Sequence, residues 1–397
     1  MTRELSRTAE VDAEPLPLPG TLRTRTPEHT WSLIEPRLRH YGVTRVAELT
    51  ALDVIGMPVY MAVRPLATTV GVSQGKGATP LLARLSATME AVEVCVAERF
   101  RPAESLWATA AELSLPYPVE ETTPTERSVI SADLPLPWVP AISLADGAET
   151  HVPLHTVGMD GLADGRWRPR SIVISTNGLA SGNSVGEATV QALLEAVERH
   201  STADLAQQPI EQRRVLDLAT LPAGFCRDLI ERMRSLGFWI EAVDCSTLPG
   251  TAAFTVYVWR PDMPSMYAGA GCHVLPETAL FRALTEAVQS RMSVISGVRE
   301  DLGDVAYRGV RRPATPPPVE PNHDWAAVPA PTAPLGGPFP VLARWLTERV
   351  TAVSGLPVLR VDLTPPEEPF AVCKVVAPGL AFDVYRELPR DTGEVRS

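Results

Sequence analysis

Lysine is almost missing from this sequence. Lys76 and Lys374 are the two lysines among 36 basic residues, which leaves 34 arginines. With 39 prolines and abundant alanine, this composition is typical of a GC-rich coding bias. A lysine that survives such a bias is a candidate for a position that needs a compact ammonium group, which a forked guanidinium does not replace. Chance survival of either lysine stays open.

Other features are lacking as well. The net charge of −11 provides no basic face for a general nucleic-acid binder. No apolar run approaches the roughly 18 residues of a membrane span, and the N-terminal stretch MTRELSRTAEVDAEPLPLPG has no signal-peptide core. The five cysteines are scattered without a CxxC motif, so we expect reduced thiols and no zinc site. We therefore expect a cytoplasmic protein with neither a nucleic-acid nor a membrane partner.

The order of elements favours an α+β fold. Strands and helices interleave without regular βαβ spacing, which argues against a doubly wound sheet. We expect a disordered tail over residues 1–25, which are polar and rich in proline. Residues 309–340 contain GVRRPATPPPVEP and VPAPTAPLGGP, so we predict an exposed proline-rich excursion there.

Local patterns predict several elements. A helix over residues 26–42 has Thr26 as its N-cap. A later helix begins at VLARW after the excursion. Alternating apolar and β-branched residues predict strands at 58–65, 171–176, 253–261 and 356–364, followed by a strand that carries Lys374.

A threefold internal repeat is the strongest pattern in the chain. Residues 75–93, 180–198 and 271–289 align without gaps, with alanine at the same two positions and a Glu-Ala-hydrophobic-Glu/Gln ending. Polar side chains recur at i, i+4 and i+7, which places them on one face of a helix. The alanines would allow close packing against a sheet or another helix. The polar positions are Ser86, Glu90, Glu93; Gln191, Glu195, Glu198; and Arg282, Glu286, Gln289.

Three solvated faces are the simplest explanation, but such faces usually mix in cations. These nine positions hold five glutamates and one arginine. If the faces converge, cations must neutralise the carboxylates. Mg²⁺ binds one or two carboxylates together with phosphate oxygens and water. Glycine loops before the helices would offer backbone N–H groups to phosphates. The repeat therefore predicts a magnesium–nucleotide site.

Two catalytic motifs match incompletely. SQGKG at 73–77 is no P-loop, because position 70 is Val and position 77 is Gly. GNSVG at 182–186 fits the pattern of a nucleophile elbow, but the expected strand ends near Thr176, well before Ser184. A serine hydrolase thus remains a minor alternative.

The repeat segments resemble the YcaO family. The resemblance rests on SQGKGATPLLARLSATMEAVE, STNGLASGNSVGEATVQALLEAVERH, GAGCHVLPETALFRALTEAVQSRMSVISGVREDL and the late VVAPGL. It covers roughly residues 40–390, and we expect one YcaO-like catalytic domain over residues 26–397. It implies a YcaO-like fold of mixed sheets and helices with ATP and Mg²⁺ as cofactors. It also implies ATP-dependent phosphorylation of a peptide-backbone amide oxygen, which a nucleophile then replaces.

The resemblance also implies site residues, while no catalytic residue is assigned. The cofactor-binding positions are Lys76, Ser86, Asn183, Gln191, Arg199, Arg282, Glu286, Gln289 and Arg291. The magnesium positions are Glu90, Glu93, Glu187, Glu195 and Glu198. Among the cofactor positions, Lys76, Arg199 and Arg282 would face phosphates.

The N-terminal part, YGVTRVAELTALDVIGMPVYMAVRP, resembles the branch of the family that works with a TfuA-type partner. That branch typically makes thioamides with external sulfide, so a peptide substrate, a TfuA-like protein and a sulfide donor are the expected partners. A homodimer is left open. An azoline or amidine product is the alternative within the family. The alternative that is not an enzyme is a nucleotide-binding scaffold, which activates a partner without catalysing a reaction itself.

Overall fold

The computed structural model describes residues 14–102, 106–122, 128–159, 172–299, 316–364 and 367–382. It is a mixed helix and sheet structure, as predicted, and its strand pairs are antiparallel. The helices are α1 (Pro27–Ile34), α2 (Pro80–Arg99), α3 (Ala110–Leu113), α4 (Leu154–Val157), α5 (Val185–Gln207), α6 (Phe225–Ser235), α7 (Pro276–Ser296) and α9 (Phe339–Ser354).

The strands of the described residues form four sheets. The largest contains β6 (Leu106–Ala108), β7 (Leu136–Ser143), β8 (Glu149–Pro153), β9 (Leu179–Gly182), β14 (Leu359–Asp362) and β15 (Ala371–Val376). A second contains β10 (Arg214–Val215), β11 (Trp239–Asp244), β12 (Ala252–Arg260) and β13 (Met263–His273). The two smaller sheets are β3 (Arg45–Glu48), β4 (Val59–Val63) and β5 (Val72–Lys76), and the hairpin β1 (Leu16–Leu18) with β2 (Thr21–Arg23).

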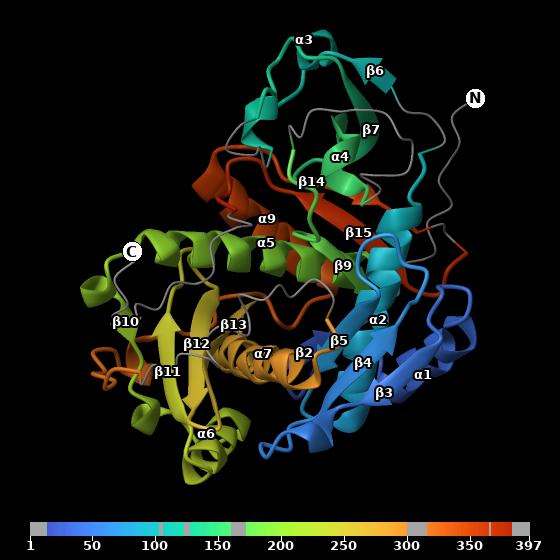
Figure 1. Cartoon of the computed structure of the whole chain (residues 1–397). Coiled ribbons are helices and arrows are strands. Elements are labelled where there is room, and N and C mark those ends of the chain that lie inside the picture. Colours follow the sequence, from blue (N-terminus) through green and yellow to red (C-terminus); the bar gives the residue numbers. More distant parts are fainter. Residues whose placement is uncertain are drawn as a thin grey trace.

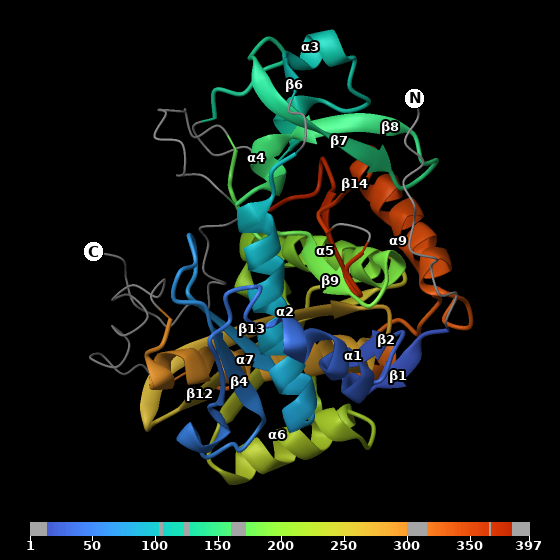
Figure 2. The ribbon, with the colours of Figure 1, turned by 90° about the vertical axis from the view of Figure 1, so that its right-hand side faces the viewer.

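The three repeats are three strand–helix units. β5 leads into α2, β9 into α5 and β13 into α7. In Figure 1, α5 crosses the middle of the molecule, α7 lies below it and α2 stands steeply beside both. Figure 2 shows the same three helices from the side. The units therefore meet at the centre of the fold, although their sequences lie about 100 residues apart.

Glycine and alanine set the distance between strand and helix in each unit. A Cβ on Gly75 would lie 1.9 Å from the backbone N of Ala87, and one on Gly271 would lie 2.3 Å from the carbonyl oxygen of Ala279. The predicted close packing of the repeat alanines is confirmed, because Ala83, Ala87 and Ala279 are fully buried. The predicted glycine loops are wrong here: Gly75 and Gly271 lie inside strands, where a side chain would push the helix away.

Side-chain hydroxyl groups cap the N-termini of two of the three repeat helices, α2 and α5. Thr79 accepts a hydrogen bond from the N–H of Leu82 and Ser184 accepts one from the N–H of Glu187. These caps satisfy backbone donors that have no partner inside the helix. Leu275 occupies the corresponding position before α7 and makes no such bond, and Pro276 begins that helix.

The N-terminal expectations need correction. Residues 16–23 form the β1–β2 hairpin, so the prediction of a disordered tail through residue 25 is wrong for this part, while residues 1–13 lie outside the described residues. The first helix begins after Thr26 as predicted, but α1 ends at Ile34 rather than near 42. Pro36 lacks the N–H that would continue the α-helical pattern, and a short 3₁₀ turn follows.

The other predicted elements agree in part. The strands at 58–65, 253–261 and 356–364 match β4, β12 and β14, and Lys374 lies in β15. The predicted strand at 171–176 is wrong: residue 171 lies outside the described residues and 173–176 have no regular structure. Within the predicted excursion, residues 316–338 are mostly exposed and contain one short 3₁₀ turn, whose Trp325 stacks on Phe254, whereas residues 339 and 340 already belong to α9. Residues 309–315 lie outside the described residues.

All five cysteines are buried and free. In the described ranges, no helix has the length and apolar character needed to cross a membrane.

Candidate nucleotide and magnesium site

The first and third repeat units meet at an ion pair. Lys76, the last residue of β5, places its Nζ 2.7 Å from Oε2 of Glu286 on α7. Gln289, one turn further along α7, donates a hydrogen bond to the carbonyl oxygen of Gln74 at 3.4 Å. The polar face of α7 is therefore held against the strand of the first unit.

The first and second units meet at Glu93. Its Oε1 accepts hydrogen bonds from the backbone N–H and the hydroxyl of Ser181, at 2.8 and 2.5 Å. Glu93 lies on α2 and Ser181 lies on β9. The polar face of α2 therefore contacts the strand of the second unit.

A third contact, made by Glu198, joins the second and third units. Together with the contacts Lys76–Glu286 and Glu93–Ser181 it completes a closed set of three contacts, here called the carboxylate ring. Oε2 of Glu198 accepts a hydrogen bond from the N–H of Cys272 on β13 at 3.0 Å. Glu93 and Glu198 occupy the same repeat position, and so do their partners Ser181 and Cys272. Each repeat helix thus contacts the strand of the next unit, and the predicted convergence of the three faces is confirmed.

Burial governs the charge of this cluster. Desolvation raises the pKa of Glu90 to about 7 and that of Glu195 to about 8, against the opposing charges of Arg299 and Arg199 respectively. Burial also raises the pKa of Glu198, and the nearby charge of Glu286 adds to this effect. Without a bound cation, part of the acidic surface is therefore protonated near neutral pH.

Glu286 differs from its repeat counterparts. Burial opposes its ionisation, but the charges of Lys76 and Arg199 outweigh burial and hold its pKa below the usual value. Arg282 contributes in the same direction. The site therefore has one carboxylate neutralised by protein cations and others that need a different counter-charge.

The donor set suits Mg²⁺ with a nucleotide better than Mg²⁺ alone. Among the described residues, no three His, Cys, Asp or Glu side chains lie close enough to hold a metal ion. Mg²⁺ in nucleotide sites takes one or two carboxylates and completes its octahedron with phosphate oxygens and water. Nε of Arg282 and Nε2 of Gln191 are buried without a protein partner, so both can donate to a ligand.

Two other predicted residues, Arg291 and Ser86, have different surroundings. Arg291 is 1% exposed and bonds Asp53 at 3.0 Å and Asp262 at 2.7 Å. Its guanidinium also lies over the ring of Phe238. These ion pairs do not favour the prediction that Arg291 binds the cofactor, because both acids already occupy its guanidinium. Ser86 is exposed on α2.

Glu187 and Asn183 contact the N-terminal segment. Glu187 is bonded by Arg23, Thr24 and Asn183, and Asn183 accepts a hydrogen bond from the hydroxyl of Thr30 at 2.9 Å. Sequence reasoning missed Arg23 and Thr24, because their short polar stretch resembles a disordered tail.

The second lysine of the chain also bears on the cluster. Lys374 is buried in β15, and its Nζ donates a hydrogen bond to the carbonyl oxygen of Ser175 at 2.6 Å. Burial lowers its pKa to about 8, although the nearby charge of Glu195 opposes the shift. The scarcity of lysine in the sequence is the signal that points to this residue, because it marks Lys374 as a position that can require an ammonium group.

Ser184 does not have the setting of a nucleophile. Strand β9 ends at Gly182, so the expected long separation from a strand is wrong. The hydroxyl of Ser184 instead accepts the N–H of Glu187 as an N-cap. The glycines of GNSVG serve helix packing and capping, which disfavours the hydrolase alternative.

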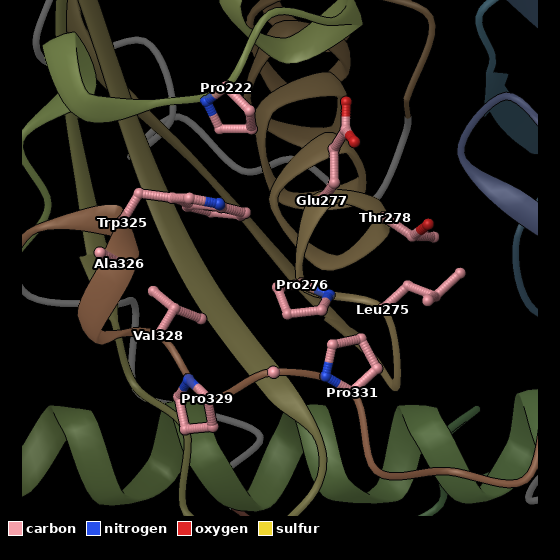
Figure 3. A pocket seen from close by; sticks show the side chains of 11 residues that line it. Pro222, Leu275, Pro276, Glu277, Thr278, Trp325, Ala326, Val328, Pro329 and Pro331 are labelled. Atoms are coloured by element: carbon pink, nitrogen blue, oxygen red, sulfur yellow. The ribbon is translucent and has the colours of Figure 1, made fainter.

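A separate apolar groove lies at the start of α7. Figure 3 shows Trp325, Val328 and Pro329 on one side of it and Leu275, Pro276 and Pro331 on the other. Its volume is about 470 Å³. None of the predicted nucleotide or magnesium residues lines this groove, so it is distinct from the carboxylate ring.

Comparisons with known proteins agree with the geometry. The chain is 36% identical over 292 residues to an uncharacterised protein of Mycobacterium tuberculosis, covering 72% of this chain and 65% of that protein. It thus spans about two thirds of the length of this relative. An uncharacterised protein in the tfuA 3′ region of Rhizobium leguminosarum bv. trifolii is 32% identical over 391 residues, covering 91% and 89% of the two chains.

A solved structure has the same fold. The structure of YcaO from Methanopyrus kandleri bound with AMPPCP and Mg²⁺ superposes with a TM-score of 0.70 at 24% identity, covering 93% of this chain and 95% of that one. The family model described as "YcaO cyclodehydratase, ATP- and Mg²⁺-binding" matches residues 74–381. The expected cofactors, ATP and Mg²⁺, agree with that description, and the chain belongs to the YcaO family.

Proposed function

We propose that this protein uses ATP and Mg²⁺ to activate a backbone amide of a peptide and that external sulfide converts the amide to a thioamide. The observation that carries the proposal is the ring of repeat units, which gathers carboxylates and cations from three distant segments at one place. A surface of this kind suits a polyphosphate with its metal ions.

The side chains divide by charge. We propose that Glu90, Glu93, Glu195 and Glu198 hold Mg²⁺ or its water ligands. The bonds to Ser181 and Cys272 use Oε1 of Glu93 and Oε2 of Glu198, so the second oxygen of each carboxylate can serve the metal ion. When bound, Mg²⁺ would neutralise charge on the phosphates.

The cationic side chains would bind the phosphates. Lys76, Arg199 and Arg282 are suited to this role because a cation stabilises charge that builds up during phosphoryl transfer. Gln191 and Gln289 can donate hydrogen bonds. Together these groups would fix the terminal phosphate beside the amide oxygen.

The proposed reaction has three steps. Hydrosulfide attacks the amide carbon and forms a C–S bond, and the resulting oxyanion takes the terminal phosphoryl group of ATP, which releases ADP. Loss of inorganic phosphate then breaks the C–O bond, and the S–H proton leaves with it to give C=S. An amide oxygen is a poor nucleophile, so attack on carbon first creates a better acceptor for phosphate. ATP turnover should therefore require both peptide and sulfide.

The neighbourhood of a relative supports the choice of product and partner. The Rhizobium protein lies in the tfuA 3′ region, so we propose a TfuA-like partner that delivers the peptide or the sulfur. The five free, buried cysteines fit a reducing compartment, and we propose that the reaction takes place in the cytoplasm.

Mass spectrometry tests the product. Peptide treated with enzyme, TfuA-like partner, ATP and sulfide should gain about 16 Da as sulfur replaces oxygen. The description of the family as cyclodehydratases favours an azoline as the second candidate. That product, or an amidine, would need no sulfide and would lose about 18 Da as water.

The same experiment tests the scaffold alternative. A loss of water would reject the thioamide proposal. An unchanged peptide, with ATP bound but intact in every combination of partner and sulfide, would favour a non-catalytic scaffold.

A further inference from the structure

Glu187 is saturated by hydrogen-bond donors. Its Oε2 accepts the N–H of Thr24 at 2.8 Å and the hydroxyl of Thr24 at 2.7 Å. Its Oε1 accepts Nη1 of Arg23 at 3.2 Å, and Nδ2 of Asn183 lies 3.2 Å from both oxygens. A carboxylate offers about four lone-pair positions, so a metal ion could bind Glu187 only by displacing these donors.

Glu187 also lies apart from the other proposed magnesium ligands. It precedes Glu195 by eight residues, which corresponds to about 12 Å along a helix. The same repeat position is Leu82 in the first unit and Thr278 in the third. The repeat therefore places no acid at this position in the other two helices, in contrast to the positions of Glu195 and Glu198.

Residues 16–30, here called the strap, have few other anchors. Leu22 is buried in the core near α5, and Gly20 packs directly on the ring of Phe281. Thr30 bonds Asn183, and Arg25 reaches the carbonyl oxygen of Pro369 at 3.4 Å. Among the described strands, β1 and β2 pair with each other alone. The start of α5 therefore supplies the strap with most of its polar contacts.

We infer that Glu187 is not a magnesium ligand but a positioning residue, which fastens the strap to the start of α5. This inference rests on the proposed function only in taking the ring as the metal site.

Two glutamine variants separate the roles of the glutamates on α5. Glu187→Gln should leave the affinity for Mg²⁺, titrated calorimetrically with AMPPCP present, within about threefold of the parent value. Hydrogen exchange in residues 16–30 should become at least about tenfold faster. Glu195→Gln should show the reverse: Mg²⁺ affinity at least about tenfold lower, with the strap still protected.

A double-mutant cycle keeps the inference testable if one variant folds poorly. Thr24→Val removes a donor to Glu187 and should also release the strap. Combined with Glu187→Gln it should add little, because both changes break the same contact. Arg25→Gln is the matched control on the same segment and should leave the exchange at Thr24 unchanged.

These measurements distinguish a failure of the inference about Glu187 from a failure of the proposed function. If Glu187→Gln weakens Mg²⁺ as much as Glu195→Gln while the strap stays protected, the inference is overturned. If Glu195→Gln leaves Mg²⁺ affinity unchanged while Glu187→Gln releases the strap, the metal site is wrong and the assignment of Glu187 stands.

Discussion

Glu90, Glu195 and Glu286 occupy the same position in three repeats but carry different charge. The pKa is raised to about 7 for Glu90 and about 8 for Glu195, mainly by burial, whereas Lys76 and Arg199 overcome burial at Glu286 and lower its pKa. Lys76 and Arg199 thus favour the ionised form of one carboxylate, whereas the other two are left to be ionised by a ligand. Sequence alone could align the three positions, but their charge depends on neighbours that only the fold supplies.

Lys76 should not tolerate arginine. Its Nζ fits the 2.7 Å contact with Glu286, and a guanidinium is larger and planar. We expect Lys76→Ala to lower peptide-dependent ATP turnover by roughly a hundredfold and Lys76→Arg by at least about tenfold. Steady-state phosphate release measures both, with the exposed Arg45→Ala as the control. Parental turnover in the arginine variant would show that a compact ammonium is not needed.

The raised pKa values predict how stability changes with pH. Since Glu90 and Glu195 keep their protons to higher pH when folded, the folded state binds more protons than the unfolded state between about pH 4.5 and 8. The unfolding free energy contributed by these groups should therefore fall as pH rises through that window.

Thermal unfolding without ligand measures the effect. The Tm should decrease from pH 5 to pH 8, with a smaller decrease in Glu195→Gln, and saturating Mg²⁺ with AMPPCP should flatten the curve. The buried Lys374, whose pKa is lowered to about 8, loses its proton at the upper end of this range and contributes with the opposite sign, so the decrease should level off towards pH 8. A steeper decrease in Glu195→Gln would contradict the charge assignment.

At the scale of elements, the strand–helix unit explains what the sequence could predict. The repeat helices follow from periodicity, because acidic and alanine positions recur without gaps over 19 residues. Strand β9 escaped prediction, since LASG is short, contains small residues and owes its structure to pairing with β15. The hairpin β1–β2 escaped for a similar reason: its contacts come from α5 and α7, far along the chain.

The strand glycines should be intolerant of alanine. Gly271→Ala would place a Cβ 2.3 Å from the carbonyl oxygen of Ala279, so α7 would have to shift. We expect a loss of about 2–3 kcal/mol in unfolding free energy, measured by chemical denaturation. Gly336→Ala is the matched control, because nothing lies within 4 Å of its added Cβ. Equal stability of the two variants would show that the strand–helix distance is adjustable.

At the scale of the whole molecule, the ring makes the site a joint property of three units. Each bond in it joins residues at least 74 positions apart: Glu198 to Cys272, Glu93 to Ser181 and Lys76 to Glu286. Periodicity indicated that these faces share a purpose, but which helix contacts which strand depends on the chain topology. The ion pairs of Arg291 could not be predicted from the repeat for the same reason, since its partners Asp53 and Asp262 lie in connecting segments outside α7.

Ligand binding should therefore protect all three units together. Hydrogen exchange measured with and without Mg²⁺ and AMPPCP should slow in β5, β9 and β13 at similar ligand concentrations, because a single ligand would bind to all three units. Glu198→Gln is expected to weaken the response in all three strands and not only in its partner β13. Protection confined to a single strand would contradict a shared site.

The two lysines have a practical consequence for chemical footprinting. An amine-reactive acylating reagent finds targets only at Lys76, Lys374 and the free amino terminus. The side chain of Lys76 is 19% exposed and Lys374 is 3% exposed, so of the two lysines in the folded protein Lys76 should be modified much more. Intact-mass spectra would then count occupied sites directly: each molecule shielded by nucleotide would lack one adduct. The scarcity of lysine thus provides a label with little background at the nucleotide site that we propose around Lys76.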